Sequence, residues 1–133
     1  MYEYSGGAFS IKVNLEPGLY LFDGNSSTGK TYLCKLLKQL RGRGEPVDGY
    51  TYADARRIGL REYLRGLDLP SQDIRVLLLD RYDMYAGQFC DVIAELREHC
   101  VVLLDCKLDH HLGTSDDGIC EIILEEGRIE VSI

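Results

Sequence analysis

Apolar and polar positions alternate along the chain in a way that predicts strands interleaved with helices. Residues 9–15 carry an apolar side chain at every second position, which is typical of a strand with one buried face. Residues 19–22, 76–79 and 101–104 are continuous apolar runs, which indicate strands buried on both faces of a parallel sheet. Residues 46–52 are a weaker candidate for another strand.

Three stripes of apolar residues at helical spacing lie between these runs. They are Leu33, Leu36, Leu37 and Leu40, then Leu60, Tyr63, Leu64 and Leu67, and finally Tyr85, Phe89, Val92, Ile93 and Leu96. Gly42 and Gly44 are expected to end the first helix. Thr51 and Asp54 have the spacing of a capping box, so we expect the second helix to begin there.

The two ends of the chain predict antiparallel structure. Residues 119–124 and 128–133 flank Glu125, Glu126 and Gly127, which is the pattern of a terminal hairpin. The expected fold class is therefore α/β: a mainly parallel sheet flanked by helices, with antiparallel strands at the N-terminus and a C-terminal hairpin. At 133 residues, the chain is expected to form one domain spanning residues 1–133.

The net charge and the length of the apolar runs exclude some classes of binding partner. The formal net charge of −7 opposes general attraction to nucleic acid or to an anionic membrane. The apolar runs are far shorter than the roughly 20 residues of a membrane span, so we expect a soluble, cytoplasmic protein without membrane insertion. Residues 30–65 nevertheless carry nine basic and four acidic side chains. This local excess indicates either solvated helix faces or attraction for a phosphate-bearing ligand or an acidic partner.

The five cysteines are expected to be reduced thiols in or near the core, because their number is odd and none has C-x-x-C spacing. An alternative is a metal site in and around the polar stretch 106–118. Its candidate ligands are Cys100, Cys106, Asp109, His110 and His111. Their spacing matches no zinc pattern, which favours solvated loop residues instead.

One segment carries specific chemistry. Residues 24–31 read Gly-Asn-Ser-Ser-Thr-Gly-Lys-Thr and fit the pattern G-x-x-x-x-G-K-[ST], between a predicted strand and a predicted helix. Such a loop turns its backbone N–H groups inward and forms an anion nest at a helix N-terminus, which suits a polyphosphate. Lys30 can reach the β and γ phosphates, and the Thr31 hydroxyl can ligate Mg²⁺. The candidate nucleotide-binding residues are Asn25, Ser26, Ser27, Thr28, Gly29, Lys30, Thr31 and Tyr32.

Acidic residues follow the later apolar runs. Asp80 ends the run 76–79 and is the candidate carboxylate on the Mg²⁺ side, because parallel strands end side by side at the ligand crevice. Asp83 and Asp105 are further candidates, with turn chemistry as the alternative for each. The candidate catalytic set is Lys30, Asp80, Asp83 and Asp105, and the candidate metal ligands are Thr31 and Asp80.

These residues resemble the P-loop NTPases, with residues 24–31 as the Walker A motif and residues 76–80 as Walker B. The layout looks most like the ATP-binding cassette and related ATPases, although the helical signature subdomain of the cassettes is missing. The resemblance implies ATP and Mg²⁺ as ligands and places the strand 101–104 between the P-loop strand and the Walker B strand. It also implies that Asp105 or Cys106 lies near the terminal phosphate. The glutamate that orients the attacking water in the family is Arg81 here.

Three functions remain open. The first is Mg-ATP binding with slow or partner-dependent hydrolysis, which implies a protein partner or a homo-oligomer. The second is a small-molecule or nucleotide kinase, although residues 106–118 contain no Arg for a phosphate-binding lid. The third is a non-hydrolysing, nucleotide-dependent switch, which the Arg81 replacement favours. GTP is less favoured than ATP, because the chain has no N-K-x-D motif.

Overall fold

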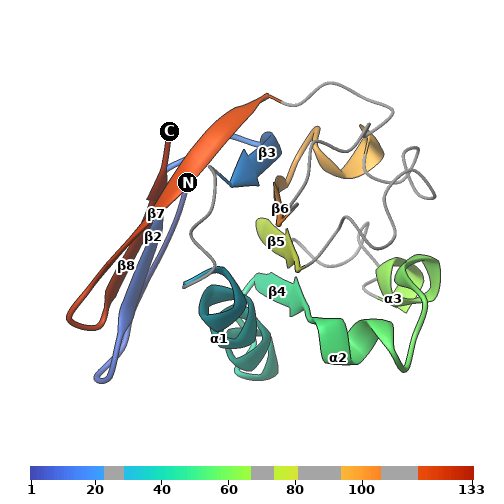
Figure 1. Ribbon diagram of the computed structural model, residues 1–133, viewed down its shortest axis with the longest axis horizontal. Helices are drawn as coiled ribbons and strands as arrows, with labels where there is room; N and C mark the ends of the chain where they lie inside the picture. The colour runs from blue at the N-terminus through green and yellow to red at the C-terminus, as the bar shows by residue number, and fades with distance from the viewer. Residues whose placement is uncertain (23–28, 67–73, 81–93, 106–116) are drawn as a thin grey trace.

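The computed structural model describes residues 1–22, 29–66, 74–80, 94–105 and 117–133 and has an α/β fold built on one mixed sheet (Figure 1). The eight strands lie in the order β1-β2-β8-β7-β3-β6-β5-β4. Their bounds are β1 Tyr2–Ser5, β2 Ser10–Val13, β3 Gly18–Phe22, β4 Val47–Tyr50, β5 Val76–Leu79, β6 Val101–Leu104, β7 Gly118–Glu125 and β8 Arg128–Ser132. The labelled helices are α1 Lys30–Gly42, α2 Tyr52–Ala55 and α3 Leu60–Gly66.

The parallel half of the sheet consists of β3, β6, β5 and β4. All three of its strand pairs are parallel, and every residue of β4, β5 and β6 is buried. The apolar runs in the sequence therefore correctly predicted strands covered on both faces. The expectation that 101–104 lies between the strands 19–22 and 76–79 is also confirmed.

The other half of the sheet joins the two ends of the chain. β1 pairs with β2 and β7 with β8 in antiparallel fashion, as expected for the two ends, while β2 and β8 pair in parallel. Glu126 and Gly127 connect β7 to β8 with φ angles of 37° and 81°, the left-handed conformation that a two-residue hairpin turn needs. A parallel pairing between β3 and β7 connects this half to the parallel half.

Two buried clusters lie on opposite faces of the sheet. On one face, α1 packs its fully buried Leu33, Leu37 and Leu40 against residues from both halves of the sheet. Figure 1 shows α1 between the strands β8 and β4, on the side toward which the sheet curves. On the other face, Leu60 and Leu64 of α3 join Leu96 and alternate residues of the parallel strands.

The prediction of one continuous second helix is wrong. Its capping box opens α2, whereas Leu60, Tyr63 and Leu64 of its apolar stripe belong to α3. Leu67, the last residue of that stripe, lies outside the described residues. The chain turns between these helices, where the Ile58 N–H donates to the Asp54 carbonyl oxygen over 2.9 Å and Gly59 precedes α3. Of the third predicted helix, residues 94–96 are helical and residues 81–93 lie outside the described part of the chain.

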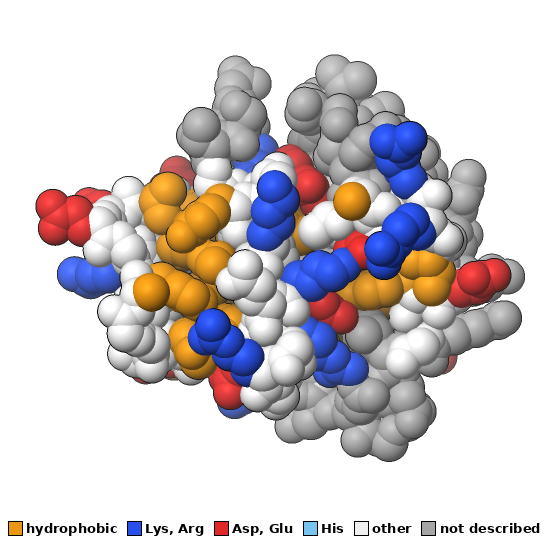
Figure 2. Space-filling model, turned by 90° about the horizontal axis from the view of Figure 1, so that it is seen from below, with side chains coloured by type: hydrophobic (Ala, Val, Ile, Leu, Met, Phe, Trp, Pro, Cys, Tyr) orange, Lys and Arg blue, Asp and Glu red, His pale blue; other side chains and the backbone are white. Residues whose placement is uncertain are grey.

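The basic segment 30–65 presents exposed Lys and Arg side chains near α1 and α2 (Figure 2). Lys38 and Arg57 both form ion pairs with Asp54, and Arg43 donates to the Tyr4 hydroxyl over 3.2 Å. Part of the local positive charge therefore forms ion pairs and hydrogen bonds within the protein. None of the helices in the described ranges has the length and apolar character that crossing a bilayer requires.

Candidate functional site

The described part of the proposed phosphate loop is its last three residues. Gly29 has a φ of 104°, a conformation that L side chains rarely adopt, and its carbonyl oxygen accepts the Leu33 N–H over 2.8 Å to begin α1. Lys30 follows as a buried residue, while Thr31 and Tyr32 are exposed. The four other proposed phosphate contacts, Asn25, Ser26, Ser27 and Thr28, lie outside the described residues.

Two predicted acidic residues lie at the carboxyl ends of neighbouring parallel strands. Asp80 follows β5, and its N–H donates to the Tyr50 carbonyl oxygen over 3.0 Å. Asp105 follows β6, and its N–H donates to the Leu79 carbonyl oxygen over 3.1 Å. The strand ladder therefore continues into both residues, which fixes their backbones at this edge. Both are almost fully buried, with 2% of Asp80 and 5% of Asp105 exposed.

Lys30 meets Asp105 at the same edge. The Lys30 Nζ lies 3.2 Å from Oδ1 of Asp105, and the two side chains are 6% and 7% exposed. The Lys30 ammonium also lies 5.8 Å from the centre of the Phe22 ring, at the end of β3. The structure thus brings together two of the predicted catalytic residues, Lys30 and Asp105, in a buried ion pair.

A second polar cluster lies where β4 ends. The Asp54 carboxylate accepts hydrogen bonds from the Thr51 N–H and from the Thr51 hydroxyl, and the Asp54 N–H donates back to that hydroxyl over 3.1 Å. Lys38 of α1 forms a close ion pair with the same carboxylate. Burial raises the pKa of Asp54, but the hydrogen bonds from Lys38 and Thr51 outweigh it and the pKa is lowered. The capping box was expected from the sequence, whereas Lys38 was not.

Between these two clusters, α1 carries a buried thiol. Burial raises the pKa of Cys34 well above its ordinary value, and the negative charges of Asp80, Asp54 and Asp48 raise it further. Cys34 is therefore a neutral packing residue rather than a nucleophile. Cys34, Cys100 and Cys120 are free and buried, as expected for reduced core thiols. Cys90 and Cys106 lie outside the described residues.

The remaining sequence candidates fall on parts of the chain that the structure does not describe. Asp83, with the neighbouring Arg81, lies in the stretch 81–93. Three candidates for the alternative metal site, Asp109, His110 and His111, lie in the stretch 106–116. Within the described ranges, there is no group of three or more His, Cys, Asp or Glu residues able to hold a metal ion by itself.

Two of the described residues carry oxygen donors of the kind that Mg²⁺ takes as ligands. Asp80 presents a buried carboxylate at the carboxyl edge, and Thr31 presents a hydroxyl at the start of α1. Both offer hard oxygen atoms, and Mg²⁺ at nucleotide sites normally takes only one or two protein ligands and completes its shell with phosphates and water.

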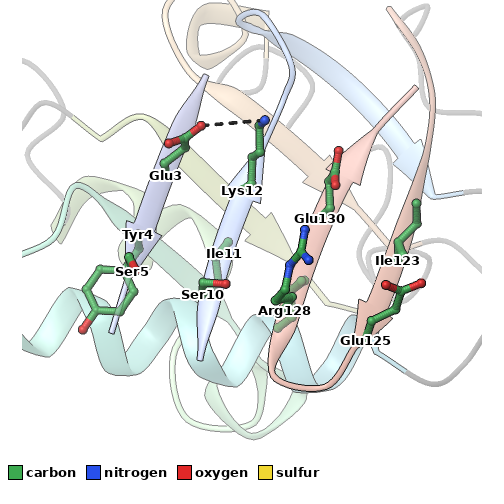
Figure 3. Close-up of a pocket in the computed structure, with 11 residues that line it drawn as sticks. Glu3, Tyr4, Ser5, Ser10, Ile11, Lys12, Ile123, Glu125, Arg128 and Glu130 are labelled. Carbon is green, nitrogen blue, oxygen red and sulfur yellow. Dashed lines mark ion pairs between the residues drawn. The ribbon is translucent and has the colours of Figure 1, made fainter. Parts of the chain in front are cut away.

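A separate hollow of about 400 Å³ lies on the other half of the sheet (Figure 3). Side chains of β1, β2, β7 and β8 line it, with opposite charges on neighbouring strands. Lys12 lies 3.9 Å from Glu3 of β1, and its register partner on β8 is Glu130. This hollow shares no residue with the cluster of Lys30, Asp80 and Asp105, so we do not assign the phosphate chemistry to it.

A scan against models of protein families finds none that matches the chain, and searches of curated proteins and of solved structures find no significant match.

Proposed function

We propose that the chain is a reduced P-loop domain that binds Mg-ATP at the carboxyl edge of its parallel sheet and hydrolyses it slowly or only with a partner. Phosphate would be held by the backbone of the loop 24–31 and by Lys30. Thr31 and Asp80 would hold the metal.

The observation that carries the proposal is the position of the Lys30 ammonium. Lys30 begins α1 directly after Gly29, and its charge is buried where β3, β6 and β5 end. Parallel sheets bind their ligands outside the carboxyl ends of the strands, where helix N-termini point at the ligand. The strand order supports the same proposal, because β6 lies between the strand that leads into the loop and the strand that ends at Asp80.

Catalysis at such a site is mostly positioning and charge stabilisation. Lys30 would neutralise the β and γ phosphates, and Asp80 would hold the hydration shell of Mg²⁺. Arg81 stands where related ATPases orient the attacking water with a glutamate, so binding is expected to persist while hydrolysis is slow. A partner could supply the missing group.

The test is titration of the protein with Mg-ATP and Mg-GTP by isothermal calorimetry, comparing wild type with Lys30→Ala. A hydrogen bond to a charged group contributes about 1.5–3 kcal/mol, so the variant is expected to bind ATP about 10- to 150-fold more weakly. Lys35→Ala is the matched control, because Lys35 is exposed on the same helix and the charge change is identical. Equal ATP affinity in wild type and Lys30→Ala would refute the proposal.

Phosphate release distinguishes the proposed ATPase from its alternatives. Steady release of phosphate without an acceptor supports the ATPase. Formation of ADP only when a hydroxyl-bearing small molecule or a nucleotide is added indicates a kinase. Binding without turnover under either condition indicates a nucleotide-dependent switch.

A further inference from the structure

Asp105 pairs with the Lys30 ammonium, which is the positive charge that a bound phosphate would need. Both side chains are more than nine-tenths buried, and their charged atoms lie 3.2 Å apart. An ammonium in this setting requires an anion nearby, because water does not solvate it well. In this structure, the carboxylate of Asp105 is that anion.

We propose that Asp105 is a competing anion for the phosphate site: it holds Lys30 in the nucleotide-free protein, and the nucleotide must take the ammonium from it. This inference rests on the proposed function, since it concerns the same lysine. It gives Asp105 a different role from activating water or contacting the terminal phosphate. Asp105 is thus a positioning residue that acts through Lys30.

The place of Asp105 in the sheet supports this role. β6 lies between β3 and β5, so Asp105 follows the middle strand of the edge at which the phosphates would bind. A carboxylate there can accept hydrogen bonds but cannot donate one to a phosphate oxygen. Its charge also repels that of the phosphates, so direct contact between them is unfavourable.

Two consequences follow for nucleotide binding. The apparent affinity falls in proportion to the fraction of molecules in which Asp105 does not hold Lys30. In addition, once Lys30 has moved to the phosphates, the Asp105 charge remains buried close to a polyanion. A divalent cation bound to the phosphates and Asp80 reduces that repulsion, so the wild-type site is expected to take the phosphate chain as its Mg²⁺ complex.

The experiment measures binding of ATP and of inorganic tripolyphosphate, each with MgCl₂ and with EDTA, to wild type and Asp105→Asn. If Lys30 is engaged by Asp105 in nine molecules of ten, removing the competitor tightens binding about tenfold. We expect Asp105→Asn to show that gain for both probes. When EDTA replaces MgCl₂, the variant should also lose less affinity than wild type does. Glu121→Gln, which removes one exposed negative charge on β7, is expected to leave both affinities unchanged.

The failures of the two proposals can be told apart. If Lys30→Ala binds ATP as wild type does, the proposed function fails. If Lys30→Ala loses binding but Asp105→Asn binds no more tightly than wild type, only the competing role of Asp105 is overturned. Asp105→Ser, which also removes the charge, provides the same comparison if Asp105→Asn does not fold. For wild type itself, equal tripolyphosphate affinity in MgCl₂ and in EDTA also contradicts the inference.

Discussion

At the scale of single residues, Asp48 is a buried carboxyl whose charged form is disfavoured by its surroundings. It lies on β4 with 6% of its surface exposed. Burial raises its pKa, while the Tyr63 side chain and the N–H of Gly49, which lies 2.8 Å from Oδ1, act in the opposite direction. Because the folded pKa lies above the ordinary value of 3.8, the protonated form favours folding. The stability that protonated Asp48 contributes is fully present below pH 3.8 and is lost as the pH rises through the folded pKa.

Asp48→Asn is therefore expected to stabilise the protein at pH 7. Asparagine keeps an acceptor for the Gly49 N–H but never ionises, so the free energy of unfolding should increase on the order of 1 kcal/mol. The advantage should disappear below pH 3.8, where the aspartate is protonated in both states. Urea unfolding between pH 3 and pH 8 measures the difference.

Asp54→Asn provides a control of opposite sign. The folded pKa of Asp54 is lowered, so its ionised form favours folding above the ordinary value of 3.8, and this contribution is lost as the pH falls through the folded pKa. The substitution should thus destabilise the protein at pH 7 and matter less in acid. If the stability change of both variants varied with pH in the same direction, at least one of the two assignments would be wrong.

Residue identities were easier to predict from the sequence than residue partners. The Walker A pattern singled out Lys30, and the ends of apolar runs singled out Asp80 and Asp105. That Lys30 pairs with Asp105, 75 positions away, depends on which strands are neighbours. Asp117 was not singled out at all, because an acid next to Asp116 in a polar stretch carries no periodic signal.

At the scale of elements, the contact between α1 and β4 is the tightest described approach involving a glycine. A Cβ added to Gly49 would lie 2.2 Å from the carbonyl oxygen of Cys34, which is backbone and cannot move aside as a flexible side chain can. Glycine at this position lets the helix lie directly on the strand.

Gly49→Ala is expected to reduce the free energy of unfolding by about 1–3 kcal/mol, the usual cost of overpacking a core. Thermal and urea unfolding measure the loss. Gly42→Ala at the end of α1 is the control, because a Cβ there meets nothing within 4 Å and alanine favours a helix. Equal stability of Gly49→Ala and wild type would mean that the helix shifts at no cost.

Elements with a clear apolar run or stripe were predicted correctly, and the candidate strand 46–52 is confirmed as β4. The continuous runs became β3, β5 and β6, and the last hairpin has the expected turn. Antiparallel structure was expected at the N-terminus, but no strand was predicted for residues 2–5, because their sequence Tyr-Glu-Tyr-Ser has no run of aliphatic residues. The predicted second helix was wrong because one apolar stripe and one capping box were read as a single element, although the chain turns between them.

At the scale of the whole molecule, the two halves of the sheet meet at one parallel strand pair, β3 with β7, which aligns Tyr20 with Gly118 and Phe22 with Cys120. Asp117 lies at the start of this junction. Its carboxylate accepts the Leu19 N–H over 2.8 Å and two hydrogen bonds from Arg97, over 3.0 and 2.6 Å. The hydrogen bond from Leu19, followed by that from Arg97, lowers the pKa of Asp117. One side chain thus connects β3, β7 and the segment before β6.

Asp117→Ala is expected to loosen this junction. It removes the acceptor of the N–H of Leu19, a residue with no exposed surface, and an unsatisfied buried donor costs about 1–3 kcal/mol. Because the pKa of Asp117 is lowered, its contribution is present above the ordinary value of 3.8 and is lost as the pH falls through the folded pKa. The loss of stability should therefore be larger at pH 7 than at pH 3.

Amide hydrogen exchange locates the effect. In Asp117→Ala, the amides of β3 and β7 should exchange faster than those of β4 and β5, because the junction opens before the parallel half unfolds. Arg97→Ala separates the two contributions, since it removes the ion pair but leaves the carboxylate on the Leu19 N–H. We expect Arg97→Ala to be milder, because a partly exposed ion pair contributes little to stability. If Arg97→Ala were as destabilising as Asp117→Ala, the ion pair rather than the backbone hydrogen bond would hold the two halves together.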